Sequence, residues 1–198
     1  MRAWVLTLAV TAALALAAPP PASTAPKRIL AQLGFIVFCR TVMTDVTARL
    51  GPGAFVGPEW PPEVNRGWYD AAGRAYLLVV RRSDEFHKGM PGVPPVIGVD
   101  FAAESHKLHV QLTTLGRPRL SLTSLRGPNG IRLGDTRERV LRILGKGEGL
   151  DRRGNIETYT YINLHTPVPR EGCGVAGFIL QVSFTGGRLT RIHIFEAS

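Results

Sequence analysis

An internal repeat constrains the fold of this chain more than any other feature of its sequence. Two segments each carry apolar residues at helical spacing, and each is followed by a glycine suited to ending a helix. The matching positions lie 94 residues apart: Val46 and Val140, Leu50 and Leu144, Gly51 and Gly145, Gly53 and Gly147. We expect Thr41 or Thr44 to cap the first helix, and Asp135 or Thr136 to cap the second.

The same order of turns and strands follows each predicted helix. The turn Asp70–Arg74 matches Asp151–Asn155, and glycine in each provides turn chemistry. Strand-like runs come next, then a loop rich in proline and glycine, at 83–95 in the first copy and 163–176 in the second. The predicted strands are Ala75–Val80 with a closing hairpin of Ile97–Phe101 and 107–112, and Ile156–Ile162 with a closing hairpin of Leu180–Phe184 and 188–194.

These blocks predict an α+β fold built from two tandem repeats. One helix with three or four antiparallel strands buries a small core and is marginal alone. Two such units can form one shared sheet with the helices on one face. We expect a signal peptide at 1–17, a flexible leader at 18–29, repeat 1 at 30–115 and repeat 2 at 116–198. The alternative is coincidence, because glycine is common in turns everywhere.

The second copy also resembles a known family. Ile131–Thr136, Val140 and Leu144–Gly147 look like the signature of the SmpA/OmlA group, the small BamE-like lipoproteins of outer-membrane assembly. Val182–Leu189 looks like their last hairpin. The β-lactamase inhibitory protein superfamily repeats the same unit twice in a chain of similar length. The resemblance implies a helix-backed antiparallel sheet and a protein-binding role in the cell envelope or outside it.

The N-terminal segment has the pattern of a secretory signal peptide. Arg2 supplies a positive charge, Ala3–Ala18 is an uncharged apolar run, and Pro19–Pro21 follows. Ala15–Ala17 fits the small-x-small cleavage pattern, so we expect an exported chain, periplasmic or secreted, that begins at Ala18. There is no lipobox cysteine near this segment. The alternative is an uncleaved anchor, although a bilayer span needs about 20 residues.

The chain is basic, with a formal net charge of +9. Residues 111–198 hold 13 basic and 7 acidic residues, and much of the excess lies between Arg117 and Arg153. A basic domain is typical of nucleic-acid binding, but export argues against a nucleic-acid partner. Contact with an anionic membrane or glycan is one interpretation of the excess charge. A charged surface that keeps the protein soluble is the other.

Strand alternation predicts a polar sheet face opposite the helices. Gln181, Arg191 and His193 share this face in the second copy, and His109 and Gln111 point the same way in the first. Antiparallel sheets often leave one side in contact with water. We therefore expect these five side chains to bind a protein partner, with an ordinary solvated face as the alternative.

The two long loops are a second candidate surface. The first presents Phe86, His87 and Lys88, and the second presents His165 and Arg170. Aromatic and arginine side chains are frequent interface anchors, and loops held by a scaffold often carry function. Phe86 could equally pack into the core.

Cys39 and Cys173 would be oxidised in an exported protein if they meet in space. The alternative is two separate thiols, with Cys39 buried. A bond between them would close a long loop and stabilise the fold.

The sequence lacks the usual signatures of catalysis and metal binding. The five histidines have no zinc-ligand spacing, and there is no Cys-x-x-Cys, Gly-x-Ser-x-Gly or phosphate loop. We therefore predict an exported, non-enzymatic protein-binding module with no cofactor and no metal. The alternatives are an envelope factor held electrostatically on an anionic membrane or glycan, and a thiol or hydrolytic enzyme that uses Cys173 with His165.

Overall fold

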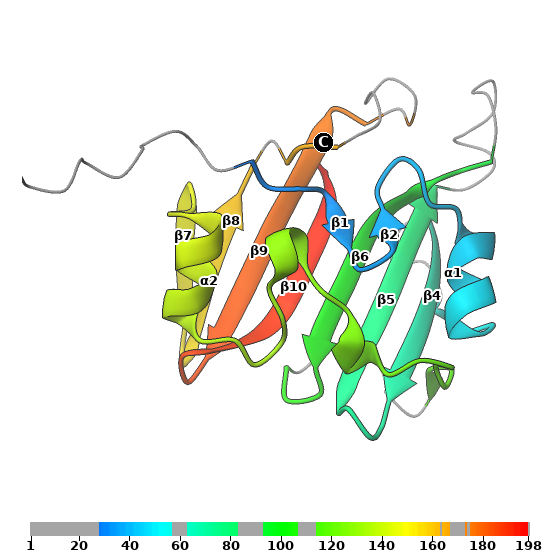
Figure 1. Ribbon diagram of the computed structural model, residues 1–198, viewed down its shortest axis with the longest axis horizontal. Helices are drawn as coiled ribbons and strands as arrows, with labels where there is room; N and C mark the ends of the chain where they lie inside the picture. Colours follow the sequence, from blue (N-terminus) through cyan, green and yellow to red (C-terminus); the bar gives the residue numbers. More distant parts are fainter. Residues whose placement is uncertain are drawn as a thin grey trace, which may run out of the picture.

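The computed structural model shows an α+β fold (Figure 1). The expected signal peptide and most of the leader lie outside its described residues. The structure describes residues 28–56, 63–82, 93–106, 114–162, 164–166, 173 and 175–197. Among them, an eight-stranded antiparallel sheet carries two α-helices.

The strands of the sheet follow the order β3-β4-β5-β6-β10-β9-β8-β7, so β6 and β10 meet in the middle. Every neighbouring pair is antiparallel. The strands are β3 (Ala54–Val56), β4 (Glu63–Asp70), β5 (Ala75–Arg82), β6 (Val96–Ala103), β7 (Gly149–Arg153), β8 (Ile156–Tyr161), β9 (Gly177–Thr185) and β10 (Arg188–Ala197). The remaining elements are β1 (Gln32–Leu33), β2 (Ile36–Val37), α1 (Met43–Leu50), η2 (Leu122–Ser124), η3 (Pro128–Gly130) and α2 (Arg137–Leu144).

Both helices have a side-chain hydrogen bond at the N-terminus and a glycine at the C-terminus. The Thr136 hydroxyl caps α2 by accepting the Arg139 backbone N–H at 3.3 Å. The N-cap of α1 is Val42, and the Asp45 carboxylate accepts its backbone N–H at 3.4 Å. The expected cap Thr41 instead accepts the Val37 N–H at 2.9 Å, which fixes the turn before the helix. Each helix ends at a glycine with positive φ, 90° at Gly51 and 88° at Gly145.

One hydrophobic core fills the space between the helices and one face of the sheet. Val46 and Leu50 of α1 and Val140 and Leu144 of α2 all belong to it. Alternate residues of the strands supply the other side, including Leu77, Val99, Phe101, Leu180, Val182, Ile192 and Ile194. The segment between β6 and α2 adds Leu122, Leu125 and Ile131. Both helices therefore cover the same sheet face (Figure 1).

Trp68 of β4 holds the C-terminal end of α1 next to the sheet. Its ring is fully buried, and its Nε1–H donates to the Gly51 carbonyl at 3.2 Å. Gly53, with a φ of 63°, passes so close that a Cβ there would lie 2.6 Å from the Trp68 ring. The turn after α1 therefore requires glycine for both backbone conformation and space.

The expected hairpin between Ile97–Phe101 and residues 107–112 is wrong. The two edges of β6 are occupied by β5 and by β10, which pairs with β6 from Val99 to Ala102. Residues 107–113 lie outside the described part of the chain. Hydrophobic alternation in Val96–Ala103 identified the strand, but it carries no information on which strand would lie beside it.

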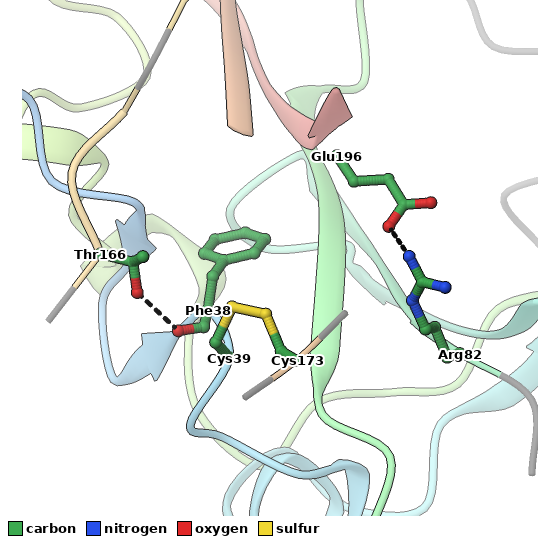
Figure 2. The surroundings of a disulfide bond; sticks show 6 residues. All are labelled: Phe38, Cys39, Arg82, Thr166, Cys173 and Glu196. Atoms are coloured by element: carbon green, nitrogen blue, oxygen red, sulfur yellow. Dashed lines mark hydrogen bonds and ion pairs between the residues drawn. A yellow bond between two sulfur atoms is a disulfide. The ribbon is translucent and has the colours of Figure 1, made fainter. Parts of the chain in front are cut away.

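A disulfide between Cys39 and Cys173 ties the start of the described chain to the segment before β9 (Figure 2). The two Cα atoms are 5.2 Å apart and 134 residues separate them in sequence. Phe38 packs beside the bond on Phe178, with ring centroids 5.1 Å apart. The Thr166 hydroxyl donates to the Phe38 carbonyl at 3.3 Å. Of the two alternatives for the cysteines, the structure has the bonded one.

Candidate partner-binding site

A polar cavity lies on the sheet face opposite the helices. Its volume is about 290 Å³, and its walls come from β7, β8, β9 and β10 and from the turn after β6. The lining residues are His106, Asp151, Arg153, Ile156, Thr158, Thr160, Gln181, Ser183 and Arg191. Two of the predicted partner-binding residues, Gln181 and Arg191, are among them.

The strand register places these side chains together. Thr158 lies opposite Ser183, and Ser183 lies opposite Arg191. In the next row on this face, Thr160 lies opposite Gln181, and Gln181 lies opposite His193. Because residues two apart on a strand face the same side, both rows point away from the helices. The hydroxyl oxygens of Thr158 and Ser183 are 2.9 Å apart, within hydrogen-bond distance.

A bidentate ion pair crosses the central strand pair at the inner wall of this cavity. Arg191 on β10 donates from Nε and Nη2 to the two carboxylate oxygens of Asp100 on β6, each at 2.7 Å. The side chains are 22% and 11% exposed, respectively. Burial opposes the charge on Arg191, but hydrogen bonds and attraction from Asp100 outweigh it and raise the arginine pKa. Arg191 therefore remains charged in this partly buried position.

Three further polar side chains surround this ion pair. Tyr76 is fully buried, and burial together with the Asp100 charge raises the pKa of its hydroxyl. Burial lowers the pKa of His193 to about 4, and it also lowers the pKa of His106. Both imidazoles are therefore neutral at pH 7. Within the described chain, the Tyr76 hydroxyl and the Nδ1 atoms of both histidines have no hydrogen-bond partner.

The prediction of an open polar face needs correction at its centre. Arg191 and His193 were expected to be available to a partner, but the side chain of Arg191 is mostly covered and its partner Asp100 is only 8% exposed. His193 stacks on Phe195 with ring centroids 4.6 Å apart. The physical reason is position, because β6 and β10 are the innermost strands and neighbouring side chains exclude water from them. The accessible part of the face lies toward the edge, at Asp151 and Arg153.

The other predicted residues divide into two groups. His165 does not reach the cavity: its backbone pairs with the chain around Leu30, and its ring hydrogen-bonds with Arg28. The remaining candidates lie outside the described residues: Phe86, His87, Lys88, His109, Gln111 and Arg170.

Sequence reasoning missed several residues that line the cavity. Thr158 and Thr160 alternate with inward-facing positions in β8, so extending the alternation argument by one strand would have identified them. Asp151 and Arg153 follow from the pairing of β7 with β8. His106 has no comparable signal, because it follows the end of β6 and reaches the cavity only through the shape of that turn.

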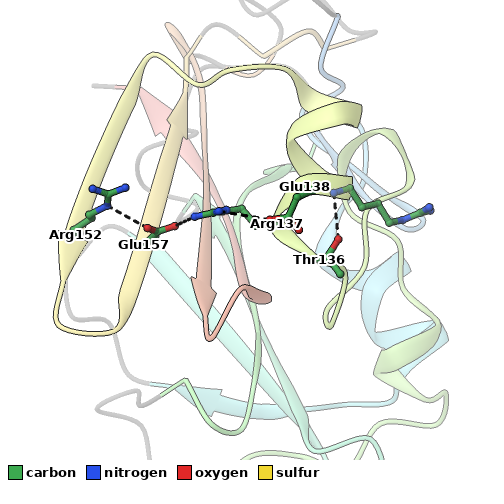
Figure 3. A network of polar contacts seen from close by, with 6 residues as sticks. Thr136, Arg137, Glu138, Arg152 and Glu157 are labelled. Carbon is green, nitrogen blue, oxygen red and sulfur yellow. Dashed lines mark hydrogen bonds and ion pairs between the residues drawn. The ribbon is translucent and has the colours of Figure 1, made fainter.

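Four arginines of the basic segment 117–153 are paired with acidic neighbours. Figure 3 shows Arg137 and Arg152 converging on Glu157, at 2.9 and 3.1 Å. Arg139 contacts Asp135 at 3.2 Å, and Arg153 contacts Asp151 at 2.8 Å. These pairs reduce the positive field expected from the sequence count alone.

The disulfide removes the thiol that a Cys173 nucleophile would need.

In the described part of the chain, no group of three or more His, Cys, Asp or Glu side chains could hold a metal ion. No helix in that part has the length and apolar character needed to cross a bilayer. No protein family, curated protein or solved structure matches the chain.

Acidification should destabilise the fold through His193. In the unfolded chain a histidine takes up a proton near its ordinary pKa of 6.5, whereas folded His193 resists protonation until its pKa of about 4. The stabilising contribution of neutral His193 should therefore be fully present above pH 6.5. The free energy of unfolding should fall by about 3 kcal/mol as the pH drops to 4. His106 shifts in the same direction and adds to the loss.

Urea denaturation at several pH values measures this loss directly. His193→Phe keeps a ring to stack on Phe195 and removes the titrating group, so its stability should vary less between pH 6.5 and 4. Equal pH slopes for the variant and the native protein would assign the effect to other groups.

Proposed function

We propose that this chain is an exported, non-enzymatic protein-binding module that engages its partner through the sheet face around the polar cavity. The observation that carries the proposal is the asymmetry of the sheet. Both helices and the core residues of the 117–136 segment pack on one face, whereas the other holds a cavity of about 290 Å³ with an accessible rim. The fixed hydroxyl, amide and guanidinium groups of this cavity suit recognition of polar groups on a protein surface.

A duplicated module is the architecture that we propose for this role. The order α1-β3-β4-β5-β6 is followed by α2-β7-β8-β9-β10, and the two sets of strands run outward from the β6–β10 pair. In the repeat, however, Ile97–Phe101 of β6 corresponds in sequence to Leu180–Phe184 of β9, not to β10. If the matches record a duplication, β10 occupies the edge of β6 at which its own counterpart in the first copy would lie.

The resemblance to the SmpA/OmlA group and the β-lactamase inhibitory protein superfamily supports the same proposal. The matching motifs lie at positions with structural roles. Thr136 caps α2, and Gly145 ends it with positive φ. Ile131 and Leu144 enter the core. Residues of this kind maintain a scaffold, so the proposal rests on the surface that the scaffold presents.

Charge pairing favours this interface over an electrostatic one at the same site. In the cavity wall, Arg153 is paired with Asp151 and Arg191 with Asp100. The cavity therefore presents balanced charge, and binding there should depend weakly on salt. Alternative attachment through the 117–153 segment would have to compete with the ion pairs of Arg137, Arg139 and Arg152 around α2.

Blocking the cavity tests the proposal. The native mature chain and the variants Thr160→Arg and Gln181→Arg are immobilised and exposed to an envelope protein extract, and captured proteins are quantified by mass spectrometry. Both positions line the cavity, so a long cationic side chain should fill it and reduce capture of the specific partner at least tenfold.

Ser124→Arg is the matched control, because it adds the same charge at an exposed position of η2, beside core residue Leu122. Capture should survive this change and should persist when the salt concentration is raised. A protein captured equally well by the native chain and both cavity variants would not bind this face, and the proposal would then be wrong.

A further inference from the structure

A second charged surface surrounds α1, on the opposite side of the sheet from the cavity. Five arginines form it, and we call them the α1 arginines: Arg40, Arg49, Arg66, Arg117 and Arg119. Among the described residues none of them has an acidic partner within salt-bridge distance, in contrast to the arginines around α2. All are exposed except Arg66, which is half-buried.

Two of these arginines line a shallow hollow beside the helix. It has a volume of about 410 Å³ and is lined by Thr44, Thr47, Ala48, Pro52, Arg66 and Arg119. None of its lining residues is acidic. The neighbouring hollow, lined in part by Arg40 and Arg49, contains the single acid Asp45.

Backbone carbonyls hold the two guanidinium groups at the hollow. Arg66 donates from Nη1 to the Pro52 carbonyl at 2.8 Å, and Arg119 donates from Nη1 to the Ala48 carbonyl at 3.4 Å. A guanidinium has five N–H donors, so each group retains donors after this single bond. Such donors suit a phosphate oxyanion, which arginine binds well.

Exposed apolar side chains lie next to both arginines. Phe55 pairs across the strands with Arg66 and is 62% exposed, and Leu120 follows Arg119 and is 51% exposed. A free phosphate ion would make no use of these side chains. Basic groups beside exposed aromatic and aliphatic side chains are typical of proteins that bind at a membrane interface.

We propose that the α1 arginines bind the surface of an anionic phospholipid membrane, with a headgroup phosphate in the hollow between Arg66 and Arg119. Phe55 and Leu120 enter the interface beside it. This goes beyond the proposed protein-binding function. It uses only the first two arginines of the 117–153 segment considered from the sequence, together with Arg40, Arg49 and Arg66. Because the cavity and the α1 arginines lie on opposite faces of the sheet, a membrane-bound molecule keeps its cavity accessible to a partner.

Vesicle sedimentation of the full-length mature chain tests the proposal. Vesicles of phosphatidylcholine with phosphatidylglycerol should bind it, and vesicles of phosphatidylcholine alone should not. The double variant Arg66→Gln/Arg119→Gln should bind the anionic vesicles roughly 30-fold more weakly, since each surface arginine contributes about a factor of five. Arg132→Gln/Lys146→Gln removes the same charge from exposed positions near α2 and should bind like the native chain.

Two further binding measurements, with inorganic phosphate and with heparin, distinguish a lipid surface from other anionic ligands. Phe55→Ser should weaken vesicle binding while leaving binding of inorganic phosphate unchanged. Three results would each overturn the proposal: equal loss in the Arg132/Lys146 control, phosphate binding without vesicle binding, or arginine-dependent binding to heparin with none to vesicles. Circular dichroism confirms that each variant is folded before it is compared.

Discussion

Replacing Cys39 and Cys173 together with alanine is expected to lower the free energy of unfolding by about 5 kcal/mol. The bond spans 134 residues, so it removes much of the freedom of the unfolded chain. Both cysteines are buried, and Phe38 and Phe178 pack beside them, which makes their position part of the core. Loss of the bond removes the covalent link between the turn after β2 and the segment that precedes β9.

Chemical denaturation of three samples separates the bond from the side chains. The oxidised native protein should be the most stable, whereas the reduced native protein and the double alanine variant should both lose most of the expected amount. If reduction has no effect on the denaturation midpoint, the closed loop contributes nothing. If only the alanine variant is destabilised, the loss comes from packing.

Asp100→Asn is the second substitution with a large expected effect, a loss of about 3–5 kcal/mol. It removes the charge that compensates Arg191 while leaving the guanidinium largely covered between β6 and β10. Arg191 then has no carboxylate for its two 2.7 Å hydrogen bonds. The cost comes from an uncompensated charge at the middle of the sheet.

The double variant Asp100→Leu/Arg191→Met tests this explanation because it removes both charges and keeps the side-chain volume similar. Thermal and urea denaturation should show it to be considerably more stable than Asp100→Asn. Glu104→Gln is the matched surface control, since it breaks the exposed pair with Arg74 and should cost less than about 1 kcal/mol. Equal losses in Asp100→Asn and the double variant would refute the explanation.

Local patterns predicted the elements of this fold well. Helical spacing followed by glycine located α1 and α2, because Gly51 and Gly145 supply a positive φ that other residues rarely adopt. Strand-like runs and alternation located β5, β6, β8, β9 and β10, because alternate side chains of each strand face the core. The α+β class follows from these elements alone.

Contacts between distant segments were harder to predict. Nothing in Val96–Ala103 specifies that β10 will lie beside it, so the sequence suggested a local hairpin instead. Alternation also assigned Arg191 and His193 to the polar face without indicating that they would be covered there. Phe195 covers His193 from the same strand, but Tyr76 and His106 come from other places in the chain and reach β10 only after folding.

The pairing of β6 with β10 also imposes an order of events during synthesis. The chain must be made at least as far as Ile194 before β6 gains its second neighbour. Until then the first four strands of the sheet expose the backbone donors and acceptors of β6, the kind of edge along which unfinished chains aggregate. A nascent chain stalled before β10 would therefore be prone to aggregation, and a chaperone that shields this edge would raise the yield of folded protein.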